Sequence, residues 1–155
     1  MRIVVTGGTG ALGNRIAHLL REAGASTVVA ARNTPTLAAA MGLSEALAVD
    51  LSIPGAGKAL VSAAAAGGPI DGIVVAHGVV AFGNIAELDD STTAQLTAIN
   101  QSSVIDIVAS AVPALRVSKA SGREPFIVTI SGVISEGPVA GMAAYGSTKA
   151  AVRSF

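Results

Sequence analysis

The sequence predicts an α/β fold in which a parallel β-sheet carries helices on both faces. Short apolar runs rich in β-branched residues alternate along the chain with longer segments of helical periodicity. Each run is hydrophobic at successive positions, which is typical of parallel strands that are buried on both sides. The alternation of strand and helix indicates a doubly wound sheet.

Length and composition agree with one globular domain, or part of one. Of the 155 residues, 51% are hydrophobic and 13% are charged, which argues against disorder. Ten basic and ten acidic side chains cancel, so no basic surface for nucleic acid or an anionic membrane is expected. The chain has no cysteine and no run of ~18 consecutive apolar residues. We therefore expect a cytoplasmic protein without a membrane span.

We expect strands at residues 3–6, 27–31, 46–49, 73–76 and 126–130. Helices are expected at about residues 11–23, 36–41, 54–66 and 91–120, and from residue 142 onward. The first helix has an apolar face opposite a polar one and is followed by Gly24, a typical terminating residue. The residues that form its apolar face are Leu12, Ile16, Leu19 and Leu20.

A polar patch interrupts the apolar stripe of the long helix. It starts at Asn100 and reads Asn-Gln-Ser-Ser. Asn and Ser side chains compete for backbone hydrogen bonds and weaken a helix interior. We therefore expect a local structural cause for this patch.

A glycine-rich turn, Gly8-x-Gly10-x-x-Gly13, follows the first strand and opens the first helix. Glycines at this place permit a tight turn, let the backbone approach a pyrophosphate, and allow close packing of helix on strand. In a chain with 18 glycines the motif alone is weak, but its position favours nucleotide binding. The candidate cofactor-binding residues of this turn are Gly7, Thr9, Gly10, Leu12 and Gly13.

The end of the second strand bears on which dinucleotide is bound. An acidic residue there would hold the ribose 2′-hydroxyl of NAD, whereas an arginine would accept the 2′-phosphate of NADP. The sequence offers Arg32 and no carboxylate, which favours NADP(H) over NAD(H). The alternative is that Arg32 is an ordinary exposed loop residue.

Other polar or small residues follow the remaining strands, and in a parallel sheet these turns converge on one edge. Asp50, followed by Leu51, could accept a hydrogen bond from an adenine amino group or could cap a turn. We interpret His77 as a turn residue rather than a catalyst, and no metal site is expected, because neither histidine has metal-ligand neighbours.

Tyr145 and Lys149 are four residues apart in the last helix and therefore share one face. The chain has one tyrosine, and such a lysine arises in roughly 2% of shuffled sequences. An adjacent cation stabilises a phenolate, so such a tyrosine can exchange a proton with a carbonyl or alcohol oxygen while a nicotinamide exchanges hydride with the carbon. The alternative is a tyrosine packed in a helix interface beside a snorkelling lysine.

Together these features resemble the short-chain dehydrogenase/reductase family, whose fold is Rossmann-like. The resemblance implies that Tyr145 is the acid/base and that Lys149 activates it and holds the nicotinamide ribose. It implies that Asn100 holds a relay water at a helix distortion, and that a serine orients the substrate oxygen. The cofactor would lie over Ala76 and Gly78.

The chain departs from the family pattern at three places. Ala11 stands where the family's best-known glycine motif has glycine, so the spacing is similar to that of ketoreductase domains and sugar-nucleotide enzymes. The usual Asn-Asn-Ala-Gly is replaced by residues 75–78, Val-Ala-His-Gly. The usual serine position, 13 residues before the tyrosine, is Gly132. Ser131 is therefore the candidate orienting residue, with Ser135 as the alternative.

The leading hypothesis is an NADP-dependent oxidoreductase that interconverts a carbonyl and a secondary alcohol on a small molecule. A non-catalytic NADP-binding regulator and a sugar-nucleotide isomerase with retained cofactor are the alternatives. We expect residues 1–155 to form a single dinucleotide-binding domain with five strands. We also expect it to lack the C-terminal part of the fold, ending within the helix of Tyr145 and Lys149, and we expect the full-length form to be a homo-oligomer.

Overall fold

The computed structural model describes residues 1–32 and 45–155, which form a three-layer α/β structure. The strands are β1 (Arg2–Thr6), β2 (Ser26–Ala31), β3 (Glu45–Ala48), β4 (Gly72–Val75) and β5 (Phe126–Thr129). They form one sheet in the order β3-β2-β1-β4-β5, and every pairing is parallel. The predicted doubly wound sheet is confirmed, because the strand order reverses direction on either side of β1.

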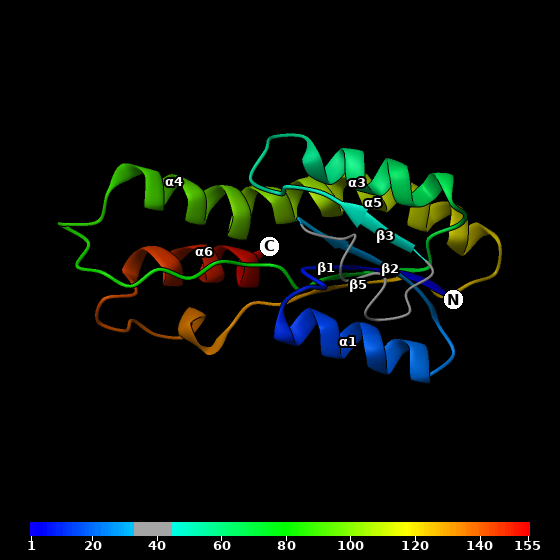
Figure 1. Ribbon diagram of the computed structural model, residues 1–155, viewed down its shortest axis with the longest axis horizontal. Coiled ribbons are helices and arrows are strands. Elements are labelled where there is room, and N and C mark those ends of the chain that lie inside the picture. The colour runs from blue at the N-terminus through cyan, green and yellow to red at the C-terminus, as the bar shows by residue number, and fades with distance from the viewer. Residues whose placement is uncertain (33–44) are drawn as a thin grey trace.

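Figure 1 shows α1 (Ala11–Glu22) on one side of the sheet and α3 (Ala56–Ala66) with α5 (Ser103–Ala120) on the other. Helix α4 (Asp90–Thr97) leads into α5, and α6 (Ala143–Ser154) ends the chain. A short 3-10 helix, η2 (Val133–Ser135), precedes α6. These helices lie within a few residues of their predicted positions. The helix predicted at 36–41 lies outside the described residues.

Alternate residues of the strands supply two hydrophobic cores, as the pleat of a buried sheet requires. Val4, Val28 and Ile73 point to the side of α3 and α5, where Ile107 is fully buried. Val5 and Val29, which directly follow Val4 and Val28 in the sequence, point to the side of α1. Both faces of the central strands are therefore covered, which explains why these strands are apolar at several successive positions.

Helix α1 packs differently from the prediction. Leu12 and Leu19 were expected on its buried face, but their side chains are 52% and 47% exposed. The residues that α1 buries are Gly13 and Ala17, with Ile16 and Leu20 only partly covered. The small side chains let the helix axis approach the sheet closely, and this leaves the larger ones at its flanks.

The long helix predicted at 91–120 is present but is interrupted. Between α4 and α5 lies a π-helical turn, η1 (Ala98–Ser102), which contains the predicted polar patch almost completely. The whole stretch is 31 residues long and contains an 18-residue window with a mean hydropathy of 1.3, so by length and composition it could cross a membrane. In this fold it is a core helix, since Ile107, Ala111 and Leu115 are buried against α3 and the sheet.

Candidate active site

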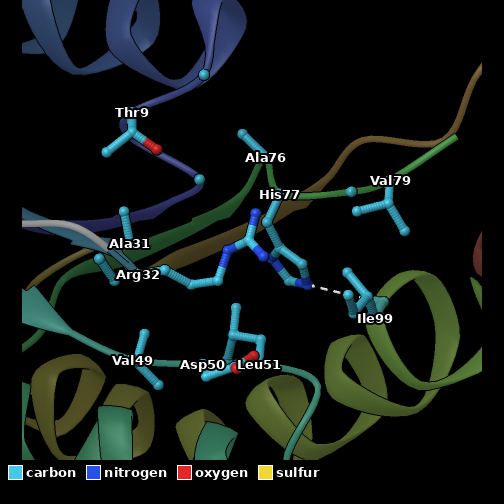
Figure 2. Close-up of a pocket in the computed structure, with 14 residues that line it drawn as sticks. Thr9, Ala31, Arg32, Val49, Asp50, Leu51, Ala76, His77, Val79 and Ile99 are labelled. Carbon is cyan, nitrogen blue, oxygen red and sulfur yellow. Dashed lines mark hydrogen bonds between the residues drawn. The ribbon is translucent and has the colours of Figure 1, made fainter. Parts of the chain in front are cut away.

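The loops after β1, β2, β3 and β4 surround a pocket of about 240 Å³ at the carboxyl edge of the sheet (Figure 2). Most of the predicted cofactor-binding residues line it. They are Gly7, Thr9, Gly10, Arg32, Asp50, Leu51, Ala76 and Gly78. The convergence expected from the sequence is therefore present. Its further lining residues are Ala30, Ala31, Val49, His77, Val79 and Ile99.

The glycine-rich turn forms the floor of the pocket beside the first turn of α1. Gly7 has a φ of 70°, a left-handed conformation, and its N–H donates to the Ala30 carbonyl at 2.9 Å. A side chain on Gly7 would lie 2.7 Å from the Cα of His77. Helix α1 begins after Gly10, and since glycine has no side chain, the N-cap residue supplies no side-chain acceptor to the first N–H groups. Leu12 and Gly13 lie in that first turn and do not line the pocket.

Arg32 and Asp50 lie on the same side of the pocket. Figure 2 shows the Arg32 side chain extended between the loop after β4 and the segment of Asp50 and Leu51. The Asp50 carboxylate accepts hydrogen bonds from the backbone N–H and the hydroxyl of Ser52, at 3.0 and 2.7 Å. These bonds lower the pKa of Asp50, and the charge of Arg32 lowers it further by a smaller amount. Asp50 thus caps a turn, as one of its two interpretations required, and also faces the pocket.

Tyr145 and Lys149 occupy the same side of α6. The Lys149 Nζ lies 5.9 Å from the centre of the Tyr145 ring and donates a hydrogen bond to the Ile130 carbonyl at 3.1 Å. Lys149 is only 6% exposed, and this burial lowers the pKa of its ammonium group. A Cβ on Gly78 would lie 3.4 Å from the same Nζ, so Lys149 reaches the loop that lines the pocket.

Asn100 sits in the π-helical turn and is 1% exposed. Its side chain pairs with the backbone of Val79, accepting from the N–H and donating to the carbonyl, both at 2.8 Å. Its Nδ2 also donates to Thr148 Oγ1 at 3.2 Å, and that hydroxyl donates to the Tyr145 carbonyl at 2.8 Å. The polar patch therefore has the local cause expected of it, a helix distortion that joins the loop after β4 to α6.

The two candidate serines use their hydroxyl protons within the protein. Ser131 donates to the Lys149 carbonyl at 2.8 Å, and Ser135 donates to the Gly132 carbonyl at 2.7 Å. Ser131 therefore holds the lysine turn of α6 against the end of β5. To orient a substrate oxygen by donation, either hydroxyl would first have to leave its present bond.

Comparison with known proteins shows which family the chain belongs to. The family model for short chain dehydrogenases matches residues 1–155, the whole chain. The chain belongs to the short chain dehydrogenase family. The resemblance inferred from the glycine turn, Asn100 and the Tyr145–Lys149 pair is thereby confirmed at the level of the family.

Solved structures of similar fold include reductases of this family. A 3-oxoacyl-(acyl-carrier-protein) reductase from Agrobacterium tumefaciens with NADP bound is 30% identical, with a TM-score of 0.87 over 97% of this chain and 59% of that one. An NADH-dependent reductase complexed with NAD is 25% identical, with a TM-score of 0.90 over 99% of this chain and 68% of that one. An actinorhodin polyketide ketoreductase with NADPH is 25% identical, with a TM-score of 0.87 over 99% of this chain and 61% of that one.

Two curated proteins are similar in sequence. A short chain dehydrogenase of Pseudocercospora fijiensis is 27% identical over 162 aligned positions, which cover 98% of this chain and 51% of that protein. The polyketide synthase GfsB of Streptomyces halstedii is 38% identical over 107 residues, which cover 62% of this chain and 2% of that protein. The chain thus spans about half the length of the fungal relative.

The family implies a nicotinamide dinucleotide, and the pocket residues fit one. A cradle of glycine backbone and uncapped helix N–H groups suits a pyrophosphate, and the positive end of the α1 dipole faces it. Arg32 adds a fixed positive charge at the end of β2. Gly78 leaves open the space beside Asn100 and Lys149 that a side chain would narrow.

The sequence predicts only a turn role for His77, but in the structure its side chain connects β1, the π-helical turn and α5 of this short chain dehydrogenase. Its Nδ1 lies 2.7 Å from Thr6 Oγ1, and its Nε2 lies 2.7 Å from Ser103 Oγ and 3.1 Å from the Ile99 carbonyl. Burial lowers the pKa of His77 to about 4, and the charge of Lys149 acts in the same direction. The imidazole is therefore neutral at physiological pH. The sequence contains one indication of this role, because His77 directly follows Ala76 at the end of a strand, where site residues gather.

Proposed function

We propose that this chain supplies the cofactor pocket and the proton-transfer group of an oxidoreductase that interconverts a carbonyl and a secondary alcohol, with NADP(H) as cofactor. One observation carries the proposal. The Tyr145–Lys149 pair, joined to Asn100 through Thr148, lies beside the loop that lines the glycine-rich pocket. Hydride and proton chemistry need these two groups of residues at a single edge of the sheet.

In reduction, the Tyr145 hydroxyl gives its proton to the carbonyl oxygen. The ammonium group of Lys149 stabilises the phenolate that forms. Its Nζ is held in place by burial and by the hydrogen bond that it donates to the Ile130 carbonyl. When bound, the reduced nicotinamide supplies the hydride for the carbonyl carbon. Asn100 holds a relay water that returns a proton to the site, and Ser131 orients the substrate once its hydroxyl turns from α6.

The choice of NADP(H) is supported by residues at the end of β2 and β3. Arg32 faces the pocket beside Asp50, and the segment immediately after β2 contains no carboxylate. A guanidinium there favours a 2′-phosphate, whereas a carboxylate favours a free 2′-hydroxyl. The similar structures include both kinds, since two were solved with NADP or NADPH and one with NAD.

The proposal extends to partners and location. The substrate is a small carbonyl or alcohol compound, and the protein acts as a cytoplasmic homo-oligomer. Exposed apolar side chains on α5 and directly after α6, among them Ile105 and Phe155, support pairing with a second copy. Light scattering of the purified protein tests the oligomeric state, and a monomer at micromolar concentration would contradict the proposed homo-oligomer.

Tyr145→Phe tests the central claim. We expect turnover with NADPH and a panel of ketones to fall by about a hundredfold or more, because the proton donor is lost. NADPH affinity should stay within about twofold, because the phenol does not line the pocket. Activity equal to the wild type in this variant would refute the proposal.

A second function, an NADP-binding regulator without catalysis, is favoured by one observation. Both candidate serine hydroxyls donate within the protein, and Gly132 occupies the position where the family's serine is expected. Tight NADPH binding by calorimetry, with no reduction of any carbonyl in the panel, would establish this function instead.

A further inference from the structure

The hydrogen bonds of His77 assign its protons. The Ala76 N–H donates to Thr6 Oγ1 at 3.2 Å, so the hydroxyl proton of Thr6 is free to point at His77 Nδ1. Nδ1 then accepts and Nε2 carries the hydrogen. Ser103 Oγ donates to the Ile99 carbonyl at 2.7 Å, so it accepts from Nε2 of His77. In this one tautomer the single Nε2–H is shared between the Ser103 hydroxyl oxygen at 2.7 Å and the Ile99 carbonyl at 3.1 Å, while Nδ1 accepts from Thr6.

The π-helical turn explains why these bonds matter. The Ser103 N–H donates to the Ala98 carbonyl, five residues back instead of four. Ser103 N–H is therefore turned away from the Ile99 carbonyl, its partner in a regular α-helix. That carbonyl is instead approached by two side chains, the imidazole of His77 and the hydroxyl of Ser103. Side-chain donors of this kind stabilise an interruption of the helical ladder.

The same turn carries Asn100, which connects it to the rest of the site. Asn100 is adjacent to Ile99, holds the backbone of Val79, and reaches Thr148 between Tyr145 and Lys149. Any shift of the turn along the helix moves Asn100 with it. His77 is anchored on the other side by Thr6 at the end of β1, a residue that is fully buried in the sheet.

We infer that His77 is a positioning residue for proton transfer: by donating to Ile99 and Ser103, it fixes the π-helical turn to the sheet and keeps Asn100 in register with Tyr145 and Lys149. This inference rests on the proposed function for its catalytic consequence. The structural part, that His77 holds the turn, stands on the hydrogen bonds alone.

The test compares His77→Ala with His77→Gln. Glutamine can place an amide N–H near the position of Nε2 and so keep a donor toward the Ile99 carbonyl, whereas alanine cannot. The matched control is His18→Ala, which removes the only other histidine, an exposed residue of α1 paired with Glu22. Ser103→Ala is the second test variant, should His77→Ala fail to fold.

Two readouts do not depend on turnover. Amide hydrogen exchange follows residues 98–103, and near-ultraviolet circular dichroism follows Tyr145, the one tyrosine in a chain without tryptophan. We expect His77→Ala to speed exchange in the turn by about tenfold or more and to reduce the tyrosine signal. His77→Gln should restore most of both, and His18→Ala should change neither. Ser103→Ala should speed exchange in the same segment.

The kinetic readout separates positioning from general destabilisation. In His77→Ala we expect kcat per NADPH-binding site to fall by about tenfold or more, with the KM for NADPH within about twofold. Loss of folded protein alone would leave kcat per binding site unchanged. Unaltered exchange and tyrosine dichroism in His77→Ala, or a His77→Gln variant as impaired as His77→Ala, would overturn the inference.

Failure of the proposed function gives a different result. If the wild type binds NADPH but reduces no carbonyl, the proposed function fails, while hydrogen exchange in the turn still decides whether His77 holds it. If the wild type is active and His77→Ala keeps its full kcat, the proposed function stands and the positioning role is wrong.

Discussion

The side chains of Asn100 and Thr148 are joined by a hydrogen bond of 3.2 Å from Nδ2 to Oγ1. Both residues are buried, at 1% and 3% exposure, and they come from the π-helical turn and from α6. Thr148 lies between Tyr145 and Lys149 and donates in turn to the Tyr145 carbonyl. The distorted turn and the helix of the proposed acid/base are therefore connected by one threonine.

Thr148→Val tests this connection. Valine keeps the shape of threonine but leaves the Asn100 Nδ2 without one of its two acceptors, which costs about 1–3 kcal/mol for a buried polar group. We expect a lower midpoint of urea unfolding and a lower kcat. Thr148→Ser is the control, because it keeps the hydroxyl. Equal losses in the two variants would show that packing of the methyl group, and not the hydrogen bond, is responsible.

Arg32→Ala tests the cofactor preference. Loss of a charge-assisted bond to the 2′-phosphate should weaken NADPH binding by about ten- to a hundredfold, whereas NADH binding should change little. Calorimetric titration with both nucleotides measures this. Arg116→Ala, at an exposed position of α5, serves as the control for loss of one positive charge. An equal effect of Arg32→Ala on both nucleotides would contradict the proposed 2′-phosphate contact.

Gly78→Ala tests the space at the inner end of the pocket. The new Cβ would lie 3.2 Å from Asn100 Oδ1 and 3.4 Å from Lys149 Nζ, so at least the asparagine must move by a few tenths of an ångström. We expect the affinity for NADPH to fall by about tenfold. Gly137→Ala is a matched control, because a Cβ there meets nothing within 4 Å. Unchanged NADPH binding in Gly78→Ala would place the cofactor elsewhere.

The lowered pKa of His77 makes stability depend on pH. In the folded protein this pKa is about 4, against 6.5 for the ordinary value, so between these pH values the unfolded chain binds the extra proton. Stability is therefore full above about pH 6.5 and is lost as pH falls toward 4, by up to about 3 kcal/mol. Among the described residues, the charge of Lys149 acts on His77, and Arg32 and Asp50 line the same pocket.

Urea unfolding at a series of pH values measures this effect, with His77→Gln as the control. The variant should lose less stability than the wild type between pH 6.5 and 4. Parallel curves of stability against pH for the wild type and the variant would contradict this prediction.

Asp71 affects stability over a separate, lower pH range. Burial would raise its pKa, but bonds from Ser118, Arg123 and the Arg2 backbone outweigh burial and lower it to about 2. Its contribution is lost only as pH falls from about 3.8 toward 2.

The sequence was sufficient to predict the sheet, because buried parallel strands have a local signature that each run shows by itself. It was also sufficient to locate the glycine pocket, since the carboxyl ends of parallel strands converge wherever the sheet forms. Asn100 could be singled out because a polar residue in an apolar helix stripe requires a cause. These inferences need only local pattern and general topology.

The remaining features depend on partners that are distant in sequence. The π-helical turn is held by His77, 22 residues away from Ile99, and no local pattern joins the two. The face of α1 that packs on the sheet could not be predicted. Its large apolar residues form a plausible buried face, but the residues that are buried are Gly13 and Ala17. The direction of the Ser131 hydroxyl depends on how α6 docks against β5.

The contact of α1 with the sheet through its smallest residues has a consequence for ligand binding. A Cβ on Gly13 would clash with the Gly7 carbonyl oxygen and lie 2.8 Å from its carbon, and Ala17 is fully buried one turn further along. These two residues act as a spacer that sets how far the start of α1 stands from the end of β1. The depth of the glycine-rich pocket is therefore determined by the packing of the hydrophobic core beneath it, so that in the proposed function the same spacing contributes to stability and to cofactor binding.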